Sequence, residues 1–253
     1  HRKIDEQRGY PVDFVNALTE AGWLAAMIPE DYGGSGLGLT EASVIMEEIN
    51  RSGGNSGACH GQMYNMGTLL RHGSDVQKQR YLPRIASGEL RLQSMGVTEP
   101  TTGTDTTKIK TTAVKKGDRY VINGQKVWNT MAHLADWGML VTRSDPNAPK
   151  HKGMTYFALD MKSPGVEVRP LRQITGEAEF NEVYLTDTRV PDENRIGDIG
   201  EGWRVSLTTL MNERAAIGGG GAPKRGWGAI AALTAGWEDL PEGQKSGGKL
   251  DID

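Results

Sequence analysis

Two short polar segments hold the residues with the clearest potential for chemistry. The first, residues 97–105, reads VTEPTTGTD and is a turn rich in hydroxyl groups around Gly103. Its hydroxyls and backbone amides could hydrogen-bond the edge of a heteroaromatic ring or a pyrophosphate. Taken alone, a threonine-rich turn is more often only a turn, so the segment needs support from elsewhere in the chain.

The second segment, residues 125–130, reads QKVWNT and ends a predicted strand. Trp128 and Thr130 stand two residues apart, so a regular strand would turn an aromatic plane and a hydroxyl to the same face. By itself such a pair would usually be core packing.

The sequence lacks the signatures of several other kinds of site. It contains no G-x-G-x-x-G after a strand, no P-loop, no H-E-x-x-H and no C-x-x-C pair. The five histidines have no metal-ligand spacing, so we expect no metal site. Cys59 and His60 are neighbours, but adjacency in sequence does not indicate a nucleophile and its base.

Composition narrows the class of protein. Hydrophobic residues at 37% and charged residues at 24% of 253 predict a folded globular chain of one large or two ordinary domains. A net charge of −3 with no dense Lys/Arg block argues against nucleic acid as a partner. No stretch approaches the ~20 apolar residues of a bilayer crossing. The single cysteine agrees with a reducing compartment, so we expect a cytoplasmic protein, or a mitochondrial matrix protein in a eukaryote.

Helical periodicity dominates the N-terminal part of the chain. Apolar spacing predicts helices over residues 11–26 and 40–50. A third helix is expected to begin at Ser74, because its hydroxyl and the Gln77 side chain match a capping box. We therefore expect residues 1–93 to form a helical domain.

The pattern then changes to short β-branched and aromatic runs separated by turn residues, which predicts strands. The runs are 110–114, 119–122, 125–128, 138–143, 154–161, 166–171 and 182–185. Asn123-Gly124 predicts a type I′ hairpin between two of them, and 116–118 and 163–165 indicate further turns. Strands of this length predict a small antiparallel sandwich or barrel over residues 94–200.

Helical spacing returns after Gly202, where apolar residues follow one side of a predicted helix until the glycines at 218–221 and Pro223. The whole chain is thus expected to be an α+β protein of several domains. We assign residues 201–253 to the start of a C-terminal helical domain.

Five motifs in this sequence resemble those of the acyl-CoA dehydrogenases. They are IPEDYGG at 28–34 followed by GLG at 36–38, QKQRYLP at 77–83 with GE at 88–89, the 97–105 turn, NGQKVW at 123–128, and residues 202–214. One such motif would be weak evidence, but five in the family's order and at about its spacing are a strong match. The resemblance implies an N-terminal helical domain, a middle β-barrel or sandwich and a C-terminal helical bundle.

The same resemblance implies that FAD is the cofactor, held between the β-domain and the helical bundle. Residues that match the family's flavin contacts are Met95, Val97, Thr98, Gly103, Thr104, Trp128, Asn129 and Thr130. In the family, the residue matching Thr104 also lies near the acyl-CoA, and that matching Thr130 lies near the hydride-accepting nitrogen. The sequence departs from the usual Gly-Ala-Gly-Ser at 101–104 and has Met95 where an aromatic is frequent.

The implied reaction needs a base that removes a weakly acidic α-proton while hydride leaves the β-carbon. A carboxylate taken out of water can have its basicity raised for this work. Most family members carry the base late in the C-terminal bundle, but a subset similar to isovaleryl- and long-chain enzymes carries it before an arginine on the first helix after the β-domain. Glu213 and Arg214 match that arrangement, so Glu213 is the candidate base, with Asn212 and Arg214 towards the substrate. The alternative for Glu213 is a solvated helix glutamate.

The resemblance therefore implies an oxidoreductase of fatty acid or lipid metabolism that converts an acyl-CoA to the trans-2-enoyl-CoA. Its electron acceptor would be an electron-transfer flavoprotein, and its assembly a homodimer, a homotetramer or a heteromer. Two alternatives stay open from the sequence. One is an acyl-CoA oxidase-like flavoenzyme, and the other is a non-catalytic or complementing subunit of a heteromeric enzyme.

Overall fold

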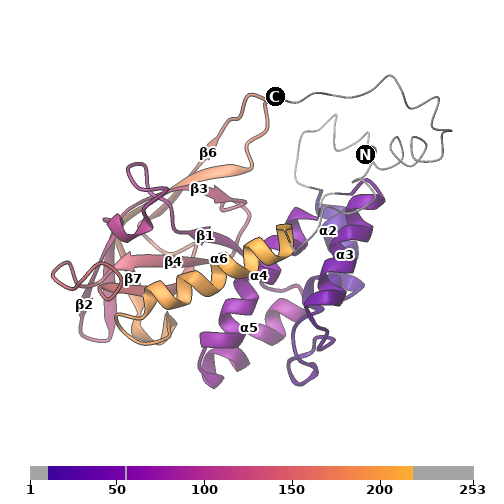
Figure 1. Ribbon diagram of the computed structural model, residues 1–253, viewed down its shortest axis with the longest axis horizontal. Helices are drawn as coiled ribbons and strands as arrows, with labels where there is room; N and C mark the ends of the chain where they lie inside the picture. Colours follow the sequence, from indigo (N-terminus) through magenta and orange to yellow (C-terminus); the bar gives the residue numbers. More distant parts are fainter. Residues whose placement is uncertain (1–10, 55, 219–253) are drawn as a thin grey trace, which may run out of the picture.

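The computed structural model describes residues 11–54 and 56–218, in which helices precede a β-sheet and a long helix follows it (Figure 1). The N-terminal elements are α2 (Val12–Glu20), η1 (Trp23–Ala25), η2 (Glu30–Tyr32), α3 (Leu39–Arg51), α4 (Gly57–His72) and α5 (Asp75–Ala86). The expected order of a helical part and then a β-part is confirmed.

Local signals in the sequence explain one bound of each of two helices. Ser74 Oγ accepts the Gln77 N–H at 3.2 Å and Gln77 Oε1 accepts the Ser74 N–H at 2.9 Å, so the predicted capping box forms at the start of α5. The first helix is shorter than predicted. It ends at Glu20 because Gly22 adopts the left-handed conformation with φ 78°.

Helix α4 was not predicted, and its burial explains why. Residues 61–66 are all buried, and they include the polar Gln62 and Asn65. The Gln62 amide donates to the Leu24 carbonyl at 3.2 Å, and that of Asn65 to the Gly61 carbonyl at 2.9 Å. A helix buried on most of its faces carries no amphipathic stripe, so apolar periodicity does not reveal it.

Within residues 11–54 and 56–218, the sheet has eight strands. They are β1 (Leu92–Gly96), β2 (Thr112–Lys116), β3 (Arg119–Thr130), β4 (Trp137–Arg143), β5 (Met154–Asp160), β6 (Val166–Leu171), β7 (Phe180–Pro191) and β8 (Arg195–Ile196). Their order is β6-β7-β3-β2-β4-β5-β8, with β1 beside β4. Pairing is mostly antiparallel as expected, but β1 and β2 each pair with β4 in parallel. The predicted run 166–171 coincides with β6, whereas β1 and β8 were not predicted.

The hairpin predicted at Asn123-Gly124 is wrong. Strand β3 continues through both residues, and the turn to β2 lies at Gly117-Asp118, where Gly117 has φ 65°. Glycine is required at position 124 for a different reason. A Cβ there would lie 2.4 Å from Thr111 Oγ1, so only glycine allows the two segments to approach so closely.

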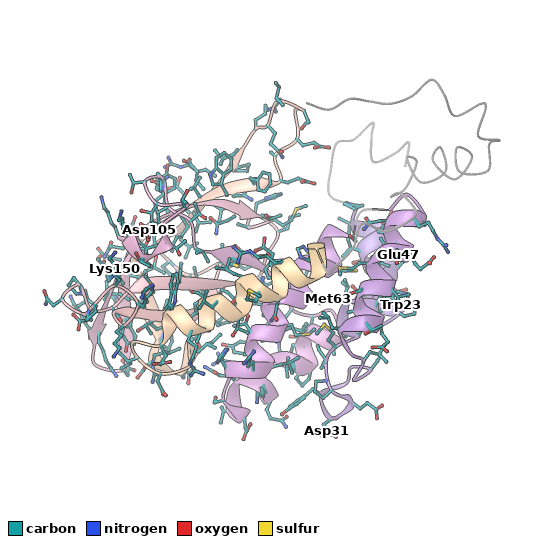
Figure 2. All side chains as sticks on the ribbon, in the orientation of Figure 1. Trp23, Asp31, Glu47, Met63, Asp105 and Lys150 are labelled. Carbon is teal, nitrogen blue, oxygen red and sulfur yellow. The ribbon has the colours of Figure 1, made fainter. Side chains whose placement is uncertain are left out.

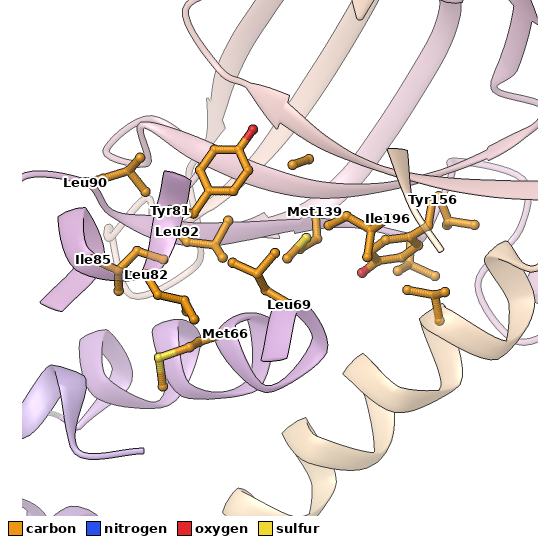
Figure 3. Packing of buried hydrophobic residues seen from close by; sticks show 14 of the residues in the cluster. Met66, Leu69, Tyr81, Leu82, Ile85, Leu90, Leu92, Met139, Tyr156 and Ile196 are labelled. Atoms are coloured by element: carbon orange, nitrogen blue, oxygen red, sulfur yellow. The ribbon is translucent and has the colours of Figure 1, made fainter. Parts of the chain in front are cut away.

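One apolar core joins the helices to the sheet. Side chains from α4, α5, β4 and β5 interlock in it (Figure 3). Its labelled members are Met66, Leu69, Tyr81, Leu82, Ile85, Leu90, Leu92, Met139, Tyr156 and Ile196. The core fixes the sheet relative to α4 and α5.

The last described element, α6 (Gly202–Gly218), begins where the sequence predicts and packs along α4 and against β5 (Figure 1). A Cβ on Gly202 would lie 2.6 Å from the Thr155 amide nitrogen, so the helix starts in backbone contact with the sheet. Of the stop predicted at the glycines 218–221 and Pro223, Gly218 is the last residue of α6 and the others lie outside the described residues. Over residues 11–54 and 56–218, no helix is both long and apolar enough to cross a bilayer.

We expect Leu82→Ala to lower the free energy of unfolding by about 2–5 kcal/mol, because Leu82 is fully buried in the shared core. Denaturant unfolding measures the loss. Val76→Ala on the same helix is the control, since Val76 is 77% exposed and should change stability by less than about 0.5 kcal/mol. Equal effects of the two substitutions would contradict this core.

Candidate functional site

The hydroxyl-rich turn lies against the end of β3. Glu99 and Thr102 close the turn with two backbone hydrogen bonds, N to O, of 3.1 and 3.0 Å. The Val127 N–H donates to the Thr98 carbonyl at 2.9 Å, which fixes the turn to the strand. A Cβ on Gly103 would lie 3.7 Å from the Thr98 methyl, so the turn brings Gly103 back beside Thr98. The structure thus brings the two predicted segments together.

A buried ion pair holds this junction. Lys126 Nζ lies 2.9 Å from Glu99 Oε1 and donates to the Val97 carbonyl at 3.1 Å. The two side chains are 0% and 5% exposed. The Glu99 carboxylate also accepts the backbone N–H groups of Lys110 at 2.6 Å and Thr111 at 2.9 Å. The pair therefore ties together β3, the turn and the chain that leads into β2.

Both members of the pair are charged at neutral pH. Burial lowers the pKa of Lys126 to about 8, although the Glu99 carboxylate opposes part of that change. Burial alone would raise the pKa of Glu99, but the Lys126 ammonium and the two backbone N–H donors outweigh it, so this pKa lies below its ordinary value. The contact is a true salt bridge.

Trp128 faces solvent because β3 is irregular at this point. The pairing with β7 shifts between Lys126 and Asn129, and Trp128 has φ 63°, which is rare for a bulky residue. Simple alternation, on which the shared face of Trp128 and Thr130 was predicted, does not apply here. The indole, in a residue 58% exposed, instead stands edge-on to Phe180 at 6.0 Å, and Phe180 is the β7 partner of Thr130.

The other predicted flavin contacts lie behind these groups. Asn129 is buried, and its amide donates to the Met95 carbonyl at 2.7 Å. The Val97 side chain is buried in the core shared with the helices. We use the term threonine–tryptophan edge for the exposed or half-buried residues Thr98, Gly103, Thr104, Trp128 and Thr130.

Glu213 lies in a second cluster, on α6 facing α4. Its carboxylate forms no hydrogen bond or salt bridge with the part of the chain that the structure describes, and its backbone carbonyl lies 3.1 Å from His60 Nε2. Burial raises the pKa of Tyr64, and the nearby charge of Glu213 raises it further. His60 and Tyr64, which pack edge to face at 5.0 Å, were not identified from the sequence because α4 was not predicted.

The neighbours of Glu213 are held to α4 and β5. Thr209, one helical turn earlier, has its hydroxyl 2.8 Å from that of Thr68 and 2.9 Å from that of Tyr156. Asn212 also faces α4, since a Cβ on Gly67 would lie 2.6 Å from Asn212 Nδ2. Arg214 is exposed. These contacts set the position of α6 along α4.

No hydrogen bond or salt bridge among residues 11–54 and 56–218 joins Glu213 to the threonine–tryptophan edge. Figure 2 labels Asp105, the last residue of the turn, on the sheet side of the molecule, and Met63 of α4 among the helices. A ligand would have to contact both clusters for them to act together.

Sequence reasoning also missed the buried ion pair. Tyr120 and Ile122 are inward-facing residues of β3, and counting on by twos reaches Lys126, so the alternation did carry a signal. Its partner Glu99 offered none, because turn residues follow no periodicity. Setting Cys59 aside agrees with the structure, where burial raises the pKa of the thiol to about 12.

Comparison with known proteins identifies the family. The model for the acyl-CoA dehydrogenase N-terminal domain matches residues 1–89, and that for the acyl-CoA dehydrogenase middle domain matches residues 94–188. The chain belongs to the acyl-CoA dehydrogenase family. These matches confirm the acyl-CoA dehydrogenase resemblance found in the sequence.

Three relatives show the extent of the similarity. "Acyl-CoA dehydrogenase FadE34" of Mycobacterium tuberculosis is 41% identical over 206 residues, which cover 81% of this chain and 29% of FadE34. The solved "Tcur3481-Tcur3483 steroid ACAD" is 34% identical with a TM-score of 0.74, covering 81% of this chain and 53% of that one. The ChsE4-ChsE5 complex from Mycobacterium tuberculosis is 33% identical with a TM-score of 0.68, covering 79% and 51%. This acyl-CoA dehydrogenase family chain spans about half of each solved relative and less than a third of FadE34.

We expect Lys126→Met to lower the free energy of unfolding by about 3–5 kcal/mol, because it leaves the Glu99 charge buried without its partner. The double variant Lys126→Met/Glu99→Gln should recover part of that loss, since no buried charge remains. Denaturant unfolding of both measures the difference.

The control is Lys115→Met, which breaks an exposed salt bridge to Asp192 of 2.9 Å in the same sheet and should change stability little. A loss at Lys126 no larger than that at Lys115 would show that the buried pair does not hold the turn.

Proposed function

We propose that this chain carries the flavin site and the base of an FAD-dependent acyl-CoA dehydrogenase, which oxidises an acyl-CoA to the trans-2-enoyl-CoA. The observation that carries the proposal is the threonine–tryptophan edge, in which a hydroxyl-rich turn is fixed beside a solvent-facing indole by a buried ion pair. Family membership supports the cofactor and the reaction.

The residues of the edge fit a flavin. The hydroxyls of Thr98, Thr104 and Thr130 form no hydrogen bond within the described residues, and none of the three residues is buried. They are therefore free to bind the polar rim of a heteroaromatic ring. The exposed indole of Trp128 adds a flat apolar surface, the kind against which an aromatic ring packs.

The proposed chemistry divides between the cofactor and two parts of the chain. Bound FAD would accept the hydride that leaves the β-carbon. The edge would hold the flavin, with groups of Met95, Val97 and Asn129 contributing. Glu213 would remove the α-proton, and its lack of a partner among the described residues leaves the carboxylate available for that proton.

The remaining proposals concern substrate, acceptor and domains. Thr104, Asn212 and Arg214 would lie towards the acyl-CoA, and electrons would pass to an electron-transfer flavoprotein.

We assign residues 1–93 to the helical domain, 94–200 to the β-domain and 201–253 to the start of a C-terminal helical domain. The family matches at 1–89 and 94–188 support this division.

A heteromer is the second candidate, and the names of two solved relatives favour it. One is titled Tcur3481-Tcur3483 and the other is the complex of ChsE4 and ChsE5, so each names a pair of proteins. In that case the chain would complete its site with an unlike polypeptide rather than with a second copy. Purified protein would then show no flavin absorbance until the second polypeptide is added.

The proposed base is tested with Glu213→Gln. We expect this variant to keep its flavin absorbance and to lose about 10²–10⁴-fold in the rate of enoyl-CoA formation, because the general base is removed. The control is Glu201→Gln. Glu201 is exposed and immediately precedes α6, so this variant should keep its activity. Full activity of Glu213→Gln would move the base elsewhere, and wild-type protein that never takes up FAD would overturn the flavin assignment.

A further inference from the structure

Lys126 lies behind the threonine–tryptophan edge and is 0% exposed, so it touches neither cofactor nor substrate directly. We propose that Lys126 is a positioning residue whose ammonium, acting through Glu99 and the Val97 carbonyl, sets the turn against Trp128 and thereby controls how tightly the site holds FAD. This inference rests on the proposed function.

The contacts of Lys126 surround one residue of the edge. Val97 and Glu99 flank Thr98 on either side, and the ammonium holds both of them, at 3.1 and 2.9 Å. The next residue along β3 donates its N–H to the Thr98 carbonyl at 2.9 Å. Thr98 is therefore fixed by the two residues that immediately precede Trp128. A shift of the ammonium would move Thr98 relative to Trp128.

The lysine side chain has little freedom to find another arrangement. A Cβ on Gly96 would lie 3.2 Å from Lys126 Cγ, so the aliphatic stem runs close against β1. A small cavity of about 10 Å³ beside it is lined largely by apolar side chains, including those of Met139, Leu140 and Leu159. Among the described residues, Glu99 is the one charged group that acts on Lys126. Within that part of the chain, the ammonium thus has no second anionic partner to which it could turn.

This arrangement should respond to pH on the alkaline side. Burial lowers the pKa of Lys126 to about 8, while the pKa of Glu99 lies below its ordinary value, so Glu99 stays ionised as Lys126 loses its proton. The salt bridge is complete below that pKa and is lost as the pH rises through it. If FAD binding needs this one proton, affinity falls by up to about tenfold for each pH unit above the pKa.

The experiment measures the dissociation constant of FAD, by flavin fluorescence, across the range from neutral to about two pH units higher. Wild type, Lys126→Met/Glu99→Gln and Lys115→Met are compared. The double variant leaves no buried charge unpaired, and Lys115→Met removes an exposed lysine of the same sheet. We expect wild type and Lys115→Met to weaken about fivefold over the last pH unit. The double variant should bind more weakly at neutral pH and show a flat profile.

Two results would overturn the inference while leaving the proposed function intact: a flat profile in wild type that binds FAD, or a double variant with wild-type affinity and profile. Ionisation of FAD itself affects all three proteins equally, so the difference between profiles isolates Lys126. Wild type that binds no FAD at any pH would instead overturn the proposed function, and the inference with it.

Discussion

The salt bridge between Lys126 and Glu99 is the interaction on which the rest of the site depends. Removing two charges from water costs several kcal/mol per ion, and their attraction offsets this only when each charge is also well hydrogen-bonded. Here the ammonium has a carboxylate and a carbonyl, and the carboxylate has two backbone N–H donors besides. Because these partners come from three separate segments, the pair is satisfied only when all three are in place. It therefore specifies one arrangement of the turn.

Trp128 depends on that arrangement. A tryptophan with φ 63° is strained, and such a residue persists only where its surroundings leave no alternative. Lys126 anchors the chain on one side of it, and Asn129 anchors the other by donating to the Met95 carbonyl at 2.7 Å. The strained residue between two buried anchors is what turns the indole to solvent. Strain and exposure of this kind are characteristic of functional sites.

The sequence predicts those parts of the structure whose causes are local. The Ser74 capping box and the bounds of β6 follow from neighbouring residues, and both are confirmed. The hairpin prediction at Asn123-Gly124 is wrong because the glycine is needed for a contact that is distant in sequence, the close approach of Thr111. Likewise the motifs identify both polar segments, but not the partner that joins them, since Lys126 and Glu99 meet only in the folded chain. The family resemblance proposes Glu213 as the base, whereas its neighbours His60 and Tyr64 come from a helix without an apolar stripe.

We propose that the ion pair holds the turn and the strand end together as one flavin-binding edge. A crystal structure of the protein grown with FAD would show whether it does. We expect the isoalloxazine ring beside Trp128 and Thr130, with Lys126 Nζ still in contact with Glu99 and the Val97 carbonyl. A flavin bound elsewhere, or bound at the edge with Lys126 turned away from Glu99, would show that the ion pair does not form the flavin site.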